Sequence, residues 1–224
     1  MPNSRNPATL SVMNQNKNFQ TLNEWQMLLL DEIRDEYTKG LLALNGLPSE
    51  TVTFYGGAKI EKSSQSYLRT KELAKSFAQR GWGVVSGGGP GIMAASLEGA
   101  RDGGGKAVAF KIDLPQESSA HVGDVDILFK HFSVRKYMLR QSNAFVFAPG
   151  GFGTLDELME DLTLIVTKKH PKKPVFLLDS KFWQGYMDWF QKILLNERHT
   201  VNRDFFSLFN IVDTTEEVMK VLYG

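Results

Sequence analysis

The sequence predicts an α/β fold, a Rossmann-like doubly wound parallel sheet of about seven strands in a single domain. From Thr51 onward, short apolar runs alternate with longer amphipathic stretches, which is typical of strands that alternate with helices. Several runs are apolar at successive positions, as in Phe145-Val146-Phe147, and this indicates strands that are covered on both faces. A chain of 224 residues is long enough to bury the core of one such domain.

The apolar runs and the stretches between them give the expected elements. The expected strands are Thr51–Tyr55, Gly83–Ser86, Ala107–Phe110, Asp126–Phe129, Ala144–Ala148, Val175–Leu178 and Asn210–Val212. The expected helices are about 66–80, 91–102, 133–142, 154–168, 181–197 and 214–222. Ligands of such sheets bind beyond the carboxyl ends of the strands, so the residues that follow each strand carry the information about function.

The N-terminal part of the chain differs from this pattern. Residues 1–20 are rich in Asn and have little apolar periodicity, so we expect a disordered tail. Residues 21–48 are expected to form a helical extension, and the α/β domain is expected over 49–224. Apolar residues of the extension recur at helical spacing: Trp25, Leu28, Leu29, Ile33 and Tyr37.

Composition excludes several classes of function. The net charge of +1 gives no basic excess for nucleic-acid binding, and the lysine cluster at 168–173 is expected to be a solvated helix end. The absence of cysteine excludes disulfides and thiolate chemistry. No apolar run approaches the ~20 residues that span a membrane, and no signal peptide is recognisable, so we expect a cytoplasmic protein without membrane or nucleic-acid partners.

Glycine-rich segments follow three of the expected strands. They are Tyr55–Lys59, Ser86–Met93 and Pro149–Thr154. Glycine lets the backbone approach a ligand closely, and the N-terminus of a following helix favours an anion. Each segment alone could be a simple turn, but three of them at strand ends indicate a shared phosphate or nucleotide site. Thr154 could cap its helix or donate its hydroxyl to a phosphate.

None of the three segments is a Walker A loop, since no Gly-Lys-Ser/Thr follows. The Ser86–Gly91 segment contains a Gly-x-Gly, but no acidic residue for a dinucleotide ribose is obvious downstream. A mononucleotide therefore fits this sequence better than a dinucleotide.

Charged residues flank the third glycine segment. Asp156 and Glu157 are expected in the first turn of the helix after Thr154, where the helix dipole favours acids and would keep them ionised. A carboxylate there could accept a hydrogen bond or orient a water. Arg135 and Lys136 are expected near the start of another helix, where cations oppose the dipole. An anionic ligand would explain that pair, and an exposed basic pair is the alternative.

These segments together resemble one known family. Residues Pro149–Glu157 match the pattern Pro-Gly-Gly-x-Gly-Thr-x-x-Glu at every fixed position, with an Arg-Lys pair upstream at 135–136. The Ser86–Met93 segment is similar to the Gly-Gly-Gly-Pro-Gly-Ile-Met segment of the bacterial branch. The chain thus resembles the LOG family of cytokinin riboside 5′-monophosphate phosphoribohydrolases, also labelled lysine decarboxylases. The resemblance covers about residues 50–224.

The resemblance implies hydrolysis of the N-glycosidic bond of a nucleoside 5′-monophosphate, AMP or a cytokinin riboside 5′-monophosphate, to free base and ribose 5-phosphate. It implies Arg135 and Glu157 as catalytic residues. It implies no cofactor and no metal, and a homodimer or larger homo-oligomer. The substrate-binding residues it implies are Gly57, Gly87, Gly88, Gly89, Met93, Lys136, Gly150, Gly151, Phe152, Gly153, Thr154 and Asp156.

Two alternatives stay open at this point. One is a non-catalytic nucleotide-binding or sensing protein on the same fold, and the other is a carrier of a larger phosphorylated ligand such as a pterin cofactor. The interval from Arg135 to Pro149 is one residue shorter than in the family. One residue rotates a helix by about 100°, so either a loop absorbs the difference or Arg135 points elsewhere. A decarboxylase is not expected, because nothing marks a lysine for pyridoxal phosphate.

Overall fold

The structure, a computed structural model, describes residues 21–114 and 123–224. The tail expected over residues 1–20 lies outside the described residues. The chain divides into two compact units, one up to Asp35 and one from Glu36 onward. Helix α2 (Glu24–Asn45) passes from the first unit into the second. Its first turn is closed by reciprocal hydrogen bonds, because the side chains of Asn23 and Gln26 each accept from the backbone N–H of the other.

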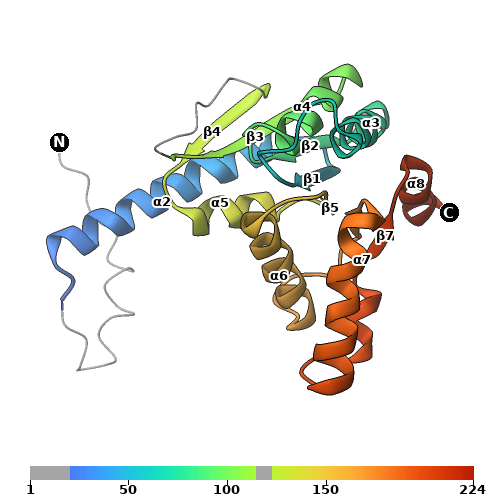
Figure 1. Cartoon of the computed structure of the whole chain (residues 1–224). Helices are drawn as coiled ribbons and strands as arrows, with labels where there is room; N and C mark the ends of the chain where they lie inside the picture. The colour runs from blue at the N-terminus through green and yellow to red at the C-terminus, as the bar shows by residue number, and fades with distance from the viewer. Residues whose placement is uncertain (1–20, 115–122) are drawn as a thin grey trace. The chain divides into compact units, whose positions relative to one another are not determined.

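The second unit contains a seven-stranded parallel sheet in the order β4-β3-β2-β1-β5-β6-β7, which confirms the predicted class (Figure 1). Its strands are β1 (Thr51–Tyr55), β2 (Gly83–Ser86), β3 (Ala107–Ile112), β4 (Val125–Phe129), β5 (Ala144–Phe147), β6 (Val175–Leu178) and β7 (Asn210–Val212). Strand β1 pairs with both β2 and β5, so the strand order reverses there. Such a switch point opens a crevice beyond the strand ends.

The helices of this unit agree with the predicted ranges to within three residues. They are α3 (Gln65–Gln79), α4 (Ile92–Asp102), α5 (Phe132–Leu139), α6 (Phe152–Val166), α7 (Ser180–Trp189) and α8 (Thr215–Tyr223). The helical stretch predicted over 181–197 is confirmed, but it has two parts, because α7 ends at Trp189 and a π-helix follows directly over Phe190–Glu197. Hydrogen bonds of a π-helix join residues five apart instead of four, a difference that a search for 3.6-residue periodicity does not detect.

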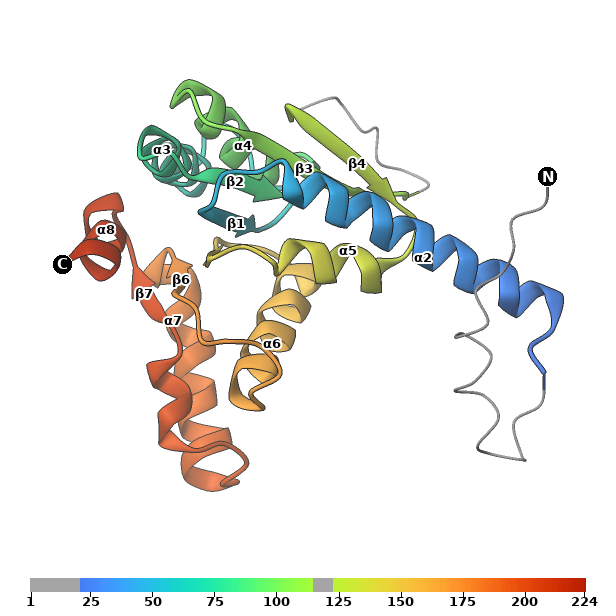
Figure 2. The ribbon, with the colours of Figure 1, turned by 180° about the vertical axis from the view of Figure 1, so that it is seen from behind.

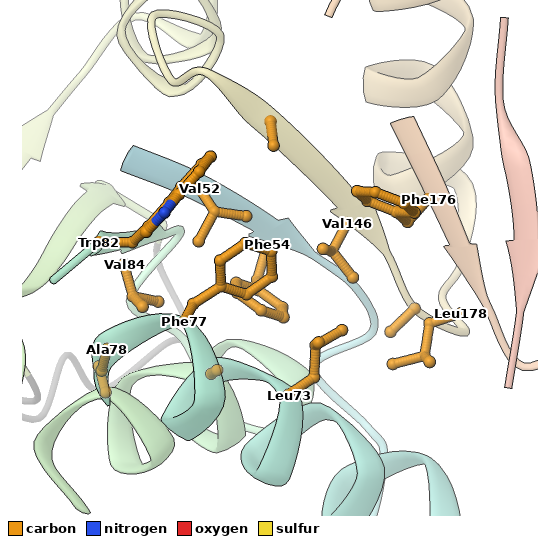
Figure 3. Packing of buried hydrophobic residues seen from close by; sticks show 14 of the residues in the cluster. Val52, Phe54, Leu73, Phe77, Ala78, Trp82, Val84, Val146, Phe176 and Leu178 are labelled. Carbon is orange, nitrogen blue, oxygen red and sulfur yellow. The ribbon is translucent and has the colours of Figure 1, made fainter. Parts of the chain in front are cut away.

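Helices α3 and α4 lie side by side on one face of the sheet in both views (Figures 1 and 2). The side chains of Val52 and Phe54 on β1 point toward this layer, where Leu73 and Phe77 of α3 are almost completely buried (Figure 3). The Phe54 and Phe77 rings meet edge to face with centroids 6.1 Å apart. The apolar interior is therefore centred on β1, the strand at the switch point.

The alternate residues of β1 face the other way. The Thr53 hydroxyl donates to the carbonyl of Leu139 at 2.6 Å, which ties β1 to the end of α5. On the same side of the molecule, the indole of Trp183 in α7 donates to the carbonyl of Phe147 at 3.0 Å. Period-two alternation thus directs successive residues of β1 to opposite layers of helices. Within the two described stretches, no helix has both the length and the apolar character needed to cross a membrane.

Candidate functional site

A cavity of about 550 Å³ lies at the carboxyl ends of the central strands. All three glycine-rich segments contribute to its wall, as predicted from their positions after β1, β2 and β5. This is where doubly wound sheets bind their ligands. The lining residues are Gly56, Gly57, Ala58, Lys59, Ile60, Gly87, Met93, Ile112, Leu114, Phe132, Arg135, Pro149, Gly150, Gly151, Gly153, Thr154, Glu157 and Phe182.

Backbone hydrogen bonds join the glycine segments to one another. The N–H of Gly57 donates to the carbonyl of Pro149 at 2.9 Å, and the N–H of Ile92 donates to the carbonyl of Gly57 at 3.1 Å. Gly91 precedes α4 with a φ of +65°, and a Cβ there would lie only 2.3 Å from the Gly57 oxygen. A side chain at this position would strain the backbone and push the two segments apart. The cavity wall is therefore a bonded unit rather than three independent turns.

Arg135 reaches the cavity from α5. Its Nε donates to the carbonyl of Phe110 at 2.7 Å, which fixes the guanidinium beside the end of β3. A Cβ on Gly87 would lie 2.2 Å from Nη2 of Arg135, so a glycine at that position leaves the guanidinium its space. Of the two outcomes expected from the shortened interval before Pro149, the structure has Arg135 directed into the cavity.

The position predicted for the basic pair needs correction. Helix α5 begins at Phe132, so Arg135 is its fourth residue and Lys136 lies in its last turn. The Nζ of Lys136 lies 2.8 Å from Oδ2 of Asp156 on α6, and it also pairs with Glu160. The opposition to the helix dipole that motivated the prediction is therefore absent for Lys136.

Glu157 faces Arg135 across the cavity, with Oε1 of the carboxylate 3.5 Å from Nη1 of the guanidinium. The prediction that Asp156 and Glu157 lie in the first turn is wrong. Helix α6 begins at Phe152, so both acids lie in the second turn. Gly151, in an extended conformation, is the N-cap residue, so Thr154, which the sequence offered as a cap, is the third residue of the helix.

The ionisation predicted for Glu157 also needs correction. Burial raises the pKa of its carboxyl from 4.5 to about 7; the Arg135 guanidinium opposes this rise, and the charge of Asp161 adds to it. Desolvation therefore outweighs the helix dipole, whose influence fades beyond the first turn. Near neutral pH the group exchanges a proton readily, which suits acid–base work.

The predicted substrate-binding residues fall into two sets. Those that line the cavity are Gly57, Gly87, Met93, Gly150, Gly151, Gly153 and Thr154. Those outside the lining are Gly88, Gly89, Lys136, Phe152 and Asp156. The Phe152 ring is 93% exposed at the first turn of α6, and the Asp156 carboxylate is largely exposed.

Sequence reasoning missed most of the apolar part of the lining. These residues are Ile60, Ile112, Leu114, Phe132 and Phe182. The position of Ile112 at the end of β3 was a usable signal, because strand ends face the crevice. Because the expected strand ended at Phe110, Ile112 was not recognised as a strand-end residue. Among the described residues, no group of three or more His, Asp or Glu side chains could hold a metal ion.

Comparisons with known proteins found relatives both by sequence and by structure. Residues 93–222 match a protein-family model described as "Possible lysine decarboxylase". The rice protein "Cytokinin riboside 5′-monophosphate phosphoribohydrolase LOG" is 35% identical over 130 residues, covering 56% of this chain and 53% of its own length. A protein from Mycobacterium marinum named "Cytokinin riboside 5′-monophosphate phosphoribohydrolase" is 30% identical over 152 residues, covering 66% of this chain and 80% of its own length. This chain spans about half the length of the rice relatives it matches.

Solved structures support the fold. The molybdenum cofactor carrier protein of Chlamydomonas reinhardtii superposes with a TM-score of 0.56 and 22% identity, over 77% of this chain and 95% of its own. The structural-genomics protein TM1055 superposes with a TM-score of 0.56 and 26% identity, over 77% of this chain and 98% of its own. At such identities the carrier protein bears on the fold alone.

Proposed function

The chain belongs to the LOG family, which the "Possible lysine decarboxylase" model describes, and on that premise we propose that it hydrolyses the N-glycosidic bond of a nucleoside 5′-monophosphate. The products are the free base and ribose 5-phosphate. The observation that carries the proposal is the Arg135–Glu157 pair, which faces a cavity walled by glycine segments. The names of the relatives support the same activity.

The wall of the cavity supports binding of the 5′-phosphate. The first residues of α6 follow Gly150 and Gly151, and the N–H groups of a first helical turn have no intrahelical acceptors. Such N–H groups and the positive end of the helix dipole suit a phosphate. The hydroxyl of Thr154 lies in the same lining and is available as a further donor. The phosphate end of the substrate is assigned to this region.

The apolar side chains of the lining support binding of the base. Side chains from α4, β3 and its following residues, α5 and α7 make it apolar: Met93, Ile112, Leu114, Phe132 and Phe182. A planar purine gains free energy there by removing apolar area from water. A base that carries an apolar substituent removes still more, so the pocket accommodates a cytokinin nucleotide as well as AMP.

Cleavage of the C1′–N bond creates charge on the ribose and on the base, and Arg135 and Glu157 stabilise that charge. As the C1′–N bond breaks, its electron pair leaves with the base, and the ribose ring becomes an oxocarbenium-like cation. The ionised Glu157 carboxylate stabilises that cation and orients a water, whose oxygen bonds to C1′ while its proton is passed to the base. Arg135 holds the phosphate or favours departure of the base by its positive charge. No cofactor enters these steps.

The test is a product assay over a panel of nucleoside 5′-monophosphates, with the free base measured by chromatography. AMP, GMP, CMP, UMP and isopentenyladenosine 5′-monophosphate make up the panel, and adenosine tests the need for the phosphate. Arg135→Ala and Glu157→Ala are expected to lower kcat/KM by about 10²–10³-fold, the range for removing one charge-stabilising group. If no nucleotide yields base above the level of Glu157→Ala, the proposal fails. Saturable AMP binding without product would then favour a sensing protein.

A homo-oligomer belongs to the same proposal. Phe152 and Phe132, which are 93% and 54% exposed, begin the two helices that flank the cavity. Large apolar side chains exposed at a site rim are typical of surfaces that another chain covers. Sedimentation equilibrium on the wild type and Phe152→Ser tests this part. If the dimer forms through this surface, the dissociation constant of the dimer should be higher in the variant.

A further inference from the structure

Asp161 is a buried carboxylate one helical turn beyond Glu157 on α6, and only 5% of it is exposed. Residues four apart on a helix are neighbours on the same face, with Cβ atoms about 5–6 Å apart. Asp161 is absent from the cavity lining, so it faces Glu157 from behind the site. Its neighbours on α6, Leu158 and Leu162, are buried apolar side chains, so Asp161 is an ionisable group in a buried part of the helix.

The partners of Asp161 come from the elements that hold the site. Its Oδ1 lies 3.7 Å from Nε of Arg140, the C-cap residue of the helix that carries Arg135. The hydroxyl of Tyr55, at the end of β1 just before the first glycine segment, lowers the pKa of the Asp161 carboxyl and so favours its charged form. Neither Nε of Arg140 nor Oδ2 of Asp161 has a hydrogen-bond partner among the described residues. The buried Asp161 carboxylate therefore has an ionic neighbour in Arg140, while its Oδ2 has no hydrogen-bond partner in the described part of the chain.

We propose that Asp161 is a positioning residue of the candidate site, whose buried carboxylate, one helical turn from Glu157 on α6, controls whether Glu157 carries a proton. The inference rests on the proposed function only for its kinetic consequence. A negative charge behind Glu157 disfavours a second negative charge on the same helix face, so it delays ionisation of Glu157 as pH rises.

The charges around both carboxylates agree with this direction. Asp161 faces Arg140 of α5, Tyr55 of β1, Lys173 before β6, and Glu160 and Glu157 of its own helix. Glu157 faces Arg135 and Lys136 of α5 and Asp156 and Asp161 of α6. Burial raises the pKa of Asp161 to about 7, while Arg140 and the Tyr55 hydroxyl oppose that rise. The two carboxylates therefore titrate in the same pH range.

Two variants separate this role from a structural one. Asp161→Asn keeps the shape and removes the charge, so the acid limb of the kcat/KM profile should move to lower pH by about half a unit or more. Tyr55→Phe removes a hydroxyl that favours the charged form of Asp161, and should move the limb in the same direction by less. Glu160→Gln is the matched control, because it removes an equal charge one residue away that pairs with Lys136 and Arg140. Its shift should be less than half that of Asp161→Asn.

A second readout does not need activity. In protein labelled with ¹³C at the glutamate carboxyl carbon, the Glu157 resonance is the one that is missing from Glu157→Gln, and its titration gives the pKa directly. Asp161→Asn should lower that pKa by about half a unit or more. An unmoved Glu157 titration, or an equal movement in Glu160→Gln, overturns the inference. A lowered pKa in a protein that releases no base would overturn the proposed function and leave the control by Asp161 standing.

Discussion

Nη1 of Arg135 and Oε1 of Glu157 lie 3.5 Å apart, although the two residues come from different helices, α5 and α6. A charge-assisted hydrogen bond is shorter, about 2.7–2.9 Å, so the pair is close without being locked together. Both groups are more than four-fifths buried and both line the cavity. The pair therefore presents a cation and a carboxylate side by side to a substrate that carries a phosphate at one end and a developing cation at the other.

Gly87→Ala should lower activity without unfolding the protein. The added Cβ would lie 2.2 Å from Nη2 of Arg135 and 2.6 Å from Sδ of Met93, both near the ends of flexible side chains. The guanidinium must move, and a displacement of about 1 Å at a site can cost up to ~10²-fold in rate. We expect kcat/KM to fall by about 10–10²-fold while the urea midpoint changes little.

Gly185→Ala is the matched control, because a Cβ at this position in α7 meets nothing within 4 Å. Its activity should equal that of the wild type, and its stability should rise by about 0.5–1 kcal/mol because alanine favours the helix. An active Gly87→Ala protein would show that the guanidinium position does not matter.

Glu157→Gln should stabilise the protein at alkaline pH. Burial raises the pKa of Glu157 from 4.5 to about 7, so the folded state binds more protons than the unfolded state between these values. The contribution of Glu157 to stability is therefore fully present below pH 4.5 and is lost as pH rises through 7. The glutamine variant should gain on the order of 3 kcal/mol over the wild type at pH 8.

Urea unfolding at pH 5 and pH 8 measures this difference, with Glu61→Gln as the control at an exposed position. The stability gain of Glu157→Gln should be larger at pH 8 than at pH 5, and Glu61→Gln should show almost no gain at either pH. A gain that does not depend on pH would contradict the raised pKa.

Gly91→Ala should damage both stability and the site. Alanine would be strained at a φ of +65°, and its Cβ would collide with the Gly57 oxygen, which accepts the hydrogen bond from Ile92. We expect a loss of about 2–4 kcal/mol in the free energy of unfolding. Gly104→Ala isolates the backbone strain, because its φ is +75° with nothing within 4 Å, and should cost only about 1 kcal/mol. Equal losses would mean that the contact between the loops contributes nothing.

The sheet was predictable because its strands are buried on both faces. Runs such as Phe145-Val146-Phe147 are apolar at every position and give their strand limits to within a residue. The glycine segments were predictable for a related reason, since a sharp turn at a strand end and a close approach of backbone to backbone both require glycine. The cavity follows from the position of these segments in the sheet.

The orientation of the site residues was not predictable in the same way. Whether Arg135 points into the cavity depends on its contact with the Phe110 carbonyl, which lies in a distant part of the sequence. The raised pKa of Glu157 depends on burial by other elements and on the Asp161 charge behind it, and the sequence pattern suggested an ionised acid instead. Desolvation by residues distant in sequence therefore affects the pKa of Glu157 more than the local helix dipole does.

The most direct test of the account measures both products of one reaction. Wild-type protein is incubated with AMP and, separately, with isopentenyladenosine 5′-monophosphate, and free base and ribose 5-phosphate are quantified over several hours beside Glu157→Gln. Hydrolysis of the N-glycosidic bond predicts equal amounts of the two products from at least one of the nucleotides. The rate in the variant should be lower by a factor of about 10² or more. Inorganic phosphate and a nucleoside as the products, or equal base release by Glu157→Gln, would contradict it.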